Sequence, residues 1–501
     1  MDVRLGAVAL LVVVATLAGC GNKTPAGGSR SPDGPQASWT APDADLQNTR
    51  HVGGPIDAAS VAKLHRVWSL PLRSLYVASP VVVDGVAYAE DLGCNVFAID
   101  VASGRLLWKR SYEVGDTGPN GVSVAGGRVF GILPDSAFAL DAKTGRELWR
   151  TRLTRDEAEL IVMTPGHAHG LTYVSTVPGV AGAIGTLYAL DDATGRRAWK
   201  WEEVPSTLWG HPEINGGGGL WHPPAFDERG GLYISIANPI PFPGTKEAPW
   251  GSSRPGDNRW DNSIVKLDAR SGRFLWGWQA LPHDIYDWDL EGPTILVRTA
   301  RGPVALTTGK LGWVFALDAG SGRLLWKRPV GVHNGHDHDG LLAMRHRYSR
   351  LKLGVKLLPG GWGGVETPMA SDGRTVYVPV NNFAGIYPTM KFAPPQQDDP
   401  ITGTGELVAL DVLTGRVKWD LKLPHSPYGA ATVSNDVVFT TTYDGTLWGV
   451  GARSGKVLWR AKLPAATDAP VAISGDTLIT TGSIPLDESQ KPAIVAYRLS
   501  G

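Results

Sequence analysis

The chain has 501 residues, 43% of them hydrophobic, and its 48 Lys and Arg residues balance its 48 Asp and Glu residues. This composition predicts a folded domain with a core. The neutral charge, without a long basic run, argues against nucleic acid as a partner, because phosphate binding requires clustered Lys and Arg.

The N-terminus predicts a targeting segment over residues 1–20. Arg4 precedes an apolar run over 5–17 that is too short to span a bilayer. The run leads into Leu-Ala-Gly-Cys at 17–20, which resembles a bacterial lipobox, so we expect Cys20 to be lipidated and the protein to be anchored in the cell envelope, outside the cytoplasm. A plain secretory signal or a weak membrane anchor is the alternative. Residues 21–45 are predicted to form a flexible tether, and residues 46–501 the folded domain.

A repeated pattern, A-x-D-x-x-T-G-x-x-x-W, runs through the rest of the chain. Apolar residues before the Asp end one strand, the D-x-x-T-G part makes a tight turn in which Gly takes a positive φ, and the next strand carries the Trp. A degenerate unit ends at Trp68, and several neighbouring Trp residues are 40 or 41 residues apart, which fits a four-stranded blade. With that unit there are eight, the other seven lying at 98–108, 139–149, 189–199, 266–276, 316–326, 409–419 and 449–459. The sequence therefore predicts an all-β, eight-bladed β-propeller.

The ends and the uneven spacing of the repeats add two expectations. Residues 493–498 form a last strand, which we expect to pair with N-terminal strands in one blade, because closing the ring removes exposed sheet edges. Trp199 and Trp276 are 77 residues apart, and Trp326 and Trp419 are 93 apart, about twice the usual unit. Extra sequence therefore lies around 201–260 and 331–400, and such loops carry binding sites in propellers.

Acidic residues crowd together at the end of the first of these regions. Asp284, Asp287 and Asp289 lie among His283, Tyr286 and Trp288. If residues 287–289 are extended, Asp287 and Asp289 point to the same side. Two carboxylates that meet repel each other unless a cation lies between them or one keeps its proton. The alternative interpretation is a surface turn capped by carboxylates.

The repeat resembles the tryptophan-docking motif of the dehydrogenases that depend on pyrroloquinoline quinone (PQQ), which are eight-bladed propellers. Non-catalytic propellers, such as the scaffold lipoprotein of outer-membrane barrel assembly, share it. The stretches 216–242 and 254–289 resemble the dehydrogenases more specifically, in a Gly-rich run with a stacking Trp and in a D-x-W-D segment. The resemblance implies a quinoprotein oxidoreductase that oxidises an alcohol or sugar hydroxyl with PQQ and a metal ion, and passes electrons to a separate acceptor. The alternative is a non-catalytic lipoprotein that binds a ligand or acts as an envelope scaffold.

The resemblance also implies roles for single residues. Trp221 matches the Trp on which the quinone stacks, and Asn238 matches a metal-binding Asn. Asp287 matches the catalytic base, which also touches the metal. Asp289 matches an acidic position that distinguishes lanthanide-using members from calcium-using ones. Lys310 matches a quinone-binding Lys or Arg, although a lysine before a strand is common.

Asn381 and Asn382 match a later Asn-rich segment that contacts the cofactor. Two family features are missing. The family's metal-binding Glu would fall near Val180, where the local run has no acid, and the pair of adjacent Cys residues is absent. We therefore expect Asn238, Asp287 and Asp289 to bind a calcium or lanthanide ion more weakly than the full set of family ligands does.

A second polar cluster, from His333 to His338, predicts either a transition-metal site or a polar turn.

Overall fold

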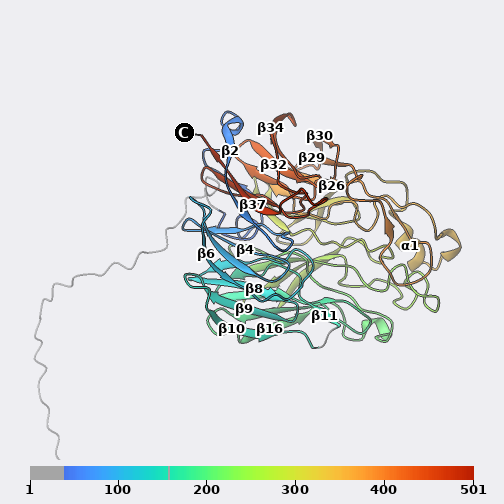
Figure 1. The fold of residues 1–501 in the computed structure, drawn as a ribbon. Coiled ribbons are helices and arrows are strands. Elements are labelled where there is room, and N and C mark those ends of the chain that lie inside the picture. Colours follow the sequence, from blue (N-terminus) through green and yellow to red (C-terminus); the bar gives the residue numbers. More distant parts are fainter. Residues whose placement is uncertain (1–38, 156–157, 501) are drawn as a thin grey trace, which may run out of the picture. The chain divides into compact units, whose positions relative to one another are not determined.

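The computed structural model describes residues 39–155 and 158–500 (Figure 1). The predicted signal segment, Cys20 and the tether up to residue 38 lie outside the described residues. Within them, the strands form eight sheets of four or five strands and two smaller two-stranded sheets, which confirms the eight-bladed β-propeller. None of the helices in this part of the chain is long and apolar enough to span a membrane.

Seven blades are built from strands in chain order. The first two are β3 (Val81–Val83), β4 (Val86–Glu90), β5 (Val96–Asp100) and β6 (Leu106–Arg110), then β7 (Ser123–Ala125), β8 (Arg128–Leu133), β9 (Ser136–Asp141) and β10 (Glu147–Arg152). The next two are β12 (Gly166–Ala168), β13 (Leu171–Ser175), β15 (Thr186–Asp191) and β16 (Arg197–Glu202), then β17 (Ala225–Phe226), β18 (Gly231–Ile236), β19 (Ser263–Asp268) and β20 (Phe274–Gln279).

The remaining three of these seven follow in the same way. They are β21 (Ile295–Thr299), β22 (Gly302–Thr308), β23 (Trp313–Asp318) and β24 (Leu324–Pro329); β25 (Ala370–Ser371), β26 (Thr375–Asn381), β29 (Gly405–Asp411) and β30 (Val417–Leu423); and β31 (Thr432–Ser434), β32 (Val437–Thr442), β33 (Thr446–Gly451) and β34 (Val457–Lys462). β1 (His51–Val52) joins the last of them in parallel with β31.

Short elements lie in the connections between the main strands. They are β11 (Glu159–Leu160) with β14 (Val177–Pro178), β27 (Gly385–Ile386) with β28 (Gln396–Gln397), the 3₁₀ turns η1 (Val61–Lys63), η2 (Leu208–Gly210) and η3 (Tyr348–Arg350), and the helix α1 (Asp339–Met344). The long connections around η2 and α1 lie in the two regions where the repeat spacing predicts extra sequence.

The eighth blade closes the ring. It combines β2 (Leu64–Pro71) with β35 (Ala472–Ser474), β36 (Thr477–Gly482) and β37 (Ala493–Leu499), and β2 pairs antiparallel with β37. Figure 1 shows β2, in blue, beside β37, in dark red. The prediction that the last strand joins an N-terminal strand is confirmed.

Each repeat connects two blades through its Gly and the preceding Trp. Gly195 has a φ of +68°, and a Cβ added there would lie 2.6 Å from the ring of Trp149 in the preceding blade. Trp149 Nε1 in turn donates a hydrogen bond of 2.9 Å to the carbonyl of Asp192. The same packing of a repeat glycine on the preceding Trp recurs at Gly104, Gly145, Gly272, Gly322, Gly415 and Gly455. The motif is therefore a contact between blades as well as a turn.

The segment over residues 39–52 connects the blades by hydrogen bonds. Its backbone carbonyls accept bonds of 2.7–2.9 Å from backbone N–H groups in the first strands of five blades: Trp39 from Val82, Leu46 from Phe226, Gln47 from Leu296, Thr49 from Ser371 and Arg50 from Val433. Trp39 is fully buried. Residues 39–45, which the sequence assigns to the tether, are thus part of the folded propeller.

Candidate functional site

A run of glycines places Trp221. Gly218 N donates to Asp261 Oδ1 at 2.6 Å, and Gly219 N donates to the carboxylate of Glu203, which is fully buried. A Cβ at Gly185 would lie only 2.0 Å from Gly219 N, so no other residue fits there without moving the chain. The run 216–219 is therefore fixed by residues that lie next to β15, β16 and β19, and Trp221 follows it after Leu220.

The D-x-W-D segment forms a tight loop. Asp284 accepts hydrogen bonds from the backbone N–H groups of Tyr286 at 3.0 Å and Trp288 at 2.9 Å. Asp287 has a φ of +61°, in the left-handed region that is costly for a residue other than Gly. Residues 287–289 are therefore not extended, so the condition under which Asp287 and Asp289 would point to the same side of a strand is not met. The carboxylates of Asp287 and Asp289 nevertheless reach the same neighbour.

That neighbour is Lys310, in the turn after β22. Its Nζ lies 2.6 Å from Asp289 Oδ2, 3.5 Å from Asp287 Oδ2 and 5.9 Å from the centre of the Trp221 ring. Asn238 N donates to the other oxygen of Asp289 at 2.8 Å. The structure thus brings together five of the residues that the sequence singles out, on loops from three consecutive blades.

Burial and charge act against each other in this cluster. Lys310 is only 6% exposed, and burial alone would lower its pKa. The nearby acids, Asp287 and Asp289 first and then Glu291 and Glu366, outweigh that effect and raise the pKa well above the usual range. Burial also raises the pKa of Asp287 well above its ordinary value, although Lys310 opposes the shift. The ammonium of Lys310 holds two carboxylates that would otherwise repel each other.

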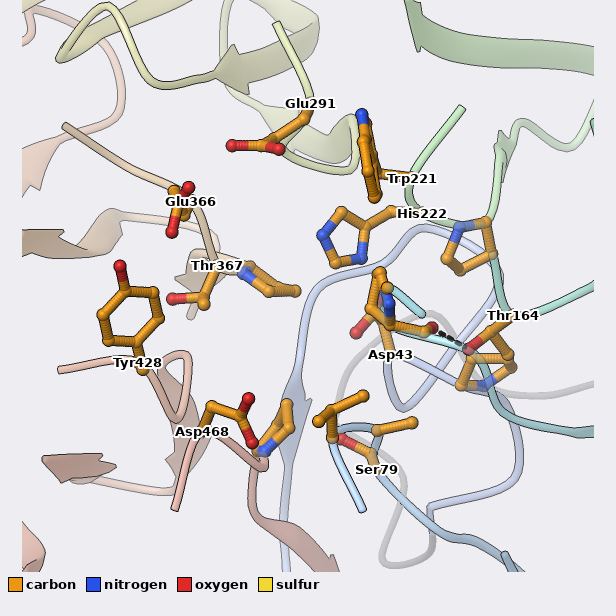
Figure 2. A pocket seen from close by; sticks show the side chains of 18 of the residues that line it. Asp43, Ser79, Thr164, Trp221, His222, Glu291, Glu366, Thr367, Tyr428 and Asp468 are labelled. Atoms are coloured by element: carbon orange, nitrogen blue, oxygen red, sulfur yellow. Dashed lines mark hydrogen bonds between the residues drawn. The ribbon is translucent and has the colours of Figure 1, made fainter. Parts of the chain in front are cut away.

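A cavity of about 370 Å³ lies beside this cluster (Figure 2). Trp221 and Lys310 form part of its wall, and Asp43 and Arg50 from the N-terminal segment form another part. Asp287 and Asp289 are not among the lining residues; Lys310 contacts both of them and itself lines the cavity.

Three further acids line the cavity and were missed by the sequence analysis: Glu291, Glu366 and Asp468. Glu291 lies two residues beyond Asp289, so the alternation of acids in D-W-D-L-E was a usable signal. Glu366 and Asp468 are single acids in long loops, without a motif that distinguishes them. Burial raises the pKa of both to about 7.

The two predicted asparagine contacts lie elsewhere. Asn382 donates to Glu406 at 3.1 Å and accepts from the backbone N–H of Val332 at 3.0 Å, and neither Asn381 nor Asn382 lines the cavity. The backbone of Asn381 pairs with Gly364, and a Cβ at Gly364 would lie 2.2 Å from the carbonyl oxygen of Lys310. Asn381 thus holds the segment that packs on Lys310. Val180, near which the family's metal-binding Glu would fall, is 49% exposed.

The histidine cluster is a bonded polar turn. His333 pairs with Asp337 at 3.0 Å, and His336 pairs with Asp339 at 2.8 Å. Asp339 also accepts a hydrogen bond of 2.8 Å from the Tyr286 hydroxyl. In the described part of the chain, no group of three or more His, Cys, Asp or Glu side chains is placed to hold a metal ion. Of the two interpretations, the structure favours the polar turn, which braces the loop that contains Asp287.

Two family models match the chain. The β-propeller domain of glucose, ethanol and alcohol dehydrogenases matches residues 172–331, and the outer membrane protein assembly factor BamB matches 95–213 and 310–500. The chain belongs to the quinoprotein dehydrogenase-like β-propeller family. Only the dehydrogenase model covers the stretch 214–309, which includes Trp221, Asn238, Asp287 and Asp289.

Members of the family are similar over most of the chain. The quinohemoprotein alcohol dehydrogenase of Comamonas testosteroni is 29% identical over 84% of this chain and 68% of its own length. The enzyme ADH-IIG of Pseudomonas putida is 27% identical over 68% of this chain, which spans only 53% of that relative. A solved europium-containing methanol dehydrogenase superposes with a TM-score of 0.77 at 20% identity, over 92% of this chain and 98% of its own. The last likeness shows the shared fold.

The family implies a quinone and a metal ion, and the cavity suits them unequally. A flat quinone fits the wall, because Trp221 offers a ring face, its Nε1 is buried without a partner among the described residues, and Lys310 supplies a cationic donor. A metal between Asp287 and Asp289 does not fit the same arrangement, because the Lys310 ammonium already binds both carboxylates.

Proposed function

We propose that this protein is a PQQ-dependent oxidoreductase that oxidises the hydroxyl group of an alcohol or a sugar and passes the electrons to a separate acceptor. We place it outside the cytoplasm, anchored to the membrane by a lipid on Cys20. The observation that supports the proposal best is the meeting of Trp221 and Lys310 at one cavity wall, where Lys310 also pairs with Asp287 and Asp289, in the stretch that the dehydrogenase model matches.

Each of these side chains has a distinct task. Trp221 provides a flat face for the quinone ring, and the Lys310 Nζ donates a hydrogen bond to an oxygen of the bound group. Asp287 accepts the hydroxyl proton of the substrate at its carboxylate, and its raised pKa makes it a stronger base than an exposed Asp. When bound, PQQ supplies the hydride acceptor.

No metal ion has a part in this scheme, because the Lys310 ammonium occupies the place between Asp287 and Asp289. Calcium or a lanthanide binds only if Lys310 turns away from the two carboxylates. The europium in the methanol dehydrogenase belongs to that protein. For this chain, a lanthanide is added to the activity assay as a test.

A scaffold function is the second candidate, because the assembly-factor model covers 95–213 and 310–500. A scaffold function does not explain why two carboxylates pair with Lys310, which lines the cavity.

The deciding experiment is dye-linked alcohol oxidation by the purified mature protein with added PQQ, alone and with calcium or lanthanum. We expect activity that Asp287→Asn lowers by about 10²-fold or more, as for other removed general bases. Retention of PQQ on a desalting column, followed by its absorbance, gives a second readout that Trp221→Ala should abolish.

Asp257→Asn, which changes an exposed acid, is the matched control. If the wild type neither retains PQQ nor oxidises any alcohol, the dehydrogenase proposal is wrong and the scaffold becomes the better reading.

A further inference from the structure

Three acids of the cavity form no ion pair with any described residue, although the charge of Lys310 acts on two of them, Glu291 and Glu366. Glu291 is 6% exposed, and its Oε1 has no hydrogen-bond partner among the described residues; Asp468 Oδ1 has none either. Figure 2 shows Glu291, Glu366 and Asp468 around the space next to Tyr428. They come from three different connections, before β21, before β25 and before β35, so the fold brings them to one place.

The cations nearby are already engaged. Arg50 pairs with Asp43, and Lys310 pairs with Asp289 at 2.6 Å. Burial lowers the pKa of His222 to about 4, so this ring is neutral at pH 7. Over residues 39–155 and 158–500, none of the three acids forms an ion pair. Burial raises the pKa of all three acids, so without a ligand they keep part of their protons, and a bound cation would favour their charged forms.

Aromatic side chains line the same space. Trp221 and Trp362 are lining residues, and the Tyr428 hydroxyl lies 3.1 Å from the Trp362 carbonyl and forms a hydrogen bond with Glu366. Aromatic faces combined with carboxylates favour organic cations, because the ring faces attract an ammonium group while tolerating its methyl or methylene groups. A small metal ion requires converging ligands, and the described residues offer no such group of three.

We propose that the cavity binds an organic ammonium ion through Glu291, Glu366, Asp468 and the rings of Trp362 and Tyr428. If the proposed function is right, the substrate is an alcohol that carries an ammonium group, that is, an amino alcohol. Binding of the ammonium ion itself requires neither PQQ nor turnover. The 45% exposure of Trp362 places an entrance to the cavity at this side chain.

The test compares choline with 3,3-dimethyl-1-butanol, which has the same shape without the charge. Both are titrated into the mature protein without PQQ, by calorimetry and by thermal shift. We expect choline to bind about tenfold more tightly or better, equivalent to at least one cation–π contact with an ion pair. Glu366→Gln with Asp468→Asn should reduce this preference to about threefold or less.

The two substitutions keep the shape of the side chains and remove buried acids, so the variant is expected to fold. Glu228→Gln, which changes an exposed acid outside the cavity, should leave the preference unchanged. Equal binding of the two alcohols, or a choline affinity that the double substitution does not lower, would overturn the proposal.

Turnover separates this proposal from the function on which its substrate statement rests. If choline binds selectively but no alcohol is oxidised with PQQ, the oxidoreductase proposal fails and the cation site stands. If neutral alcohols are bound and oxidised as well as choline, the oxidoreductase proposal stands and the cation site is wrong.

Discussion

Lys310 is the residue on which the electrostatics of the site depend. Its ammonium lies between Asp287 and Asp289, and both carboxylates are largely buried. A buried charge that loses its partner costs far more than an exposed ion pair contributes. The lysine therefore keeps together a pair of acids that would otherwise repel each other or take up a proton.

We expect Lys310→Met to lower the free energy of unfolding by about 3–5 kcal/mol, because it removes the partner of buried carboxylates. Lanthanum or calcium should then raise the melting temperature of the variant more than that of the wild type, since the place between Asp287 and Asp289 is free. Denaturant unfolding and thermal shift measure both effects.

Lys456→Met, which changes an exposed lysine, should have little effect on either measurement. A loss below about 1 kcal/mol, the scale of an exposed ion pair, would show that the wild type does not depend on this contact. Equal stabilisation of both proteins by the ions would show that Lys310 does not exclude a metal.

At the scale of the elements, the repeat turn performs two tasks with one glycine. Gly195 takes a positive φ to end the turn, and it leaves room for Trp149 of the preceding blade. A substitution there disturbs the turn and the contact between blades together. The two contributions separate by comparison with a glycine that performs only the first task.

Gly170 is that glycine, with a φ of +76° and open space where a Cβ would lie. We expect Gly195→Ala to destabilise the protein by about 1–3 kcal/mol more than Gly170→Ala does, because it adds overpacking against Trp149 to the backbone strain. Chemical denaturation of the two variants measures the difference. Similar losses would mean that the Trp contact adapts at little cost.

The elements also show what a sequence can predict. Repeats carry the same signal many times, so the blades, the positive φ of their turn glycines and the closure by residues 493–498 followed from the pattern. The acids Glu366 and Asp468 each occur once, in loops whose course depends on the surrounding blades. The sequence left open whether residues 287–289 are extended, and the hydrogen bonds that Asp284 accepts hold a tight loop there.

At the scale of the molecule, the segment 39–52 is as much a part of the propeller as any blade. Arg50 shows this most clearly, since its guanidinium donates to the Ala431 and Val471 carbonyls and to Ser79, and pairs with Asp43. These partners belong to the blades of β31 and β35, to the approach to β3, and to the segment itself. One side chain thus links distant parts of the ring.

We expect Arg50→Leu to reduce the free energy of unfolding by about 3–5 kcal/mol, since Asp43 is left buried without its partner. Backbone amide hydrogen exchange should become faster in β3, β31 and β35 together, because Arg50 bonds to residues next to all three strands. The exposed Arg105→Leu is the control. A loss confined to the segment 39–52 would contradict the view that it stabilises the ring as a unit.

The course of this segment has a consequence for how the protein comes to be folded. Arg50 leaves the ribosome early, yet the carbonyl of Ala431 that it bonds is 381 residues further along the chain. Contacts at such separations form late, because the intervening chain must be ordered before they stabilise anything. The segment 39–52 therefore cannot complete its contacts until nearly the whole polypeptide has been synthesised. A chain that stops before the blade of β31 lacks that blade and also leaves Arg50 without the Ala431 carbonyl.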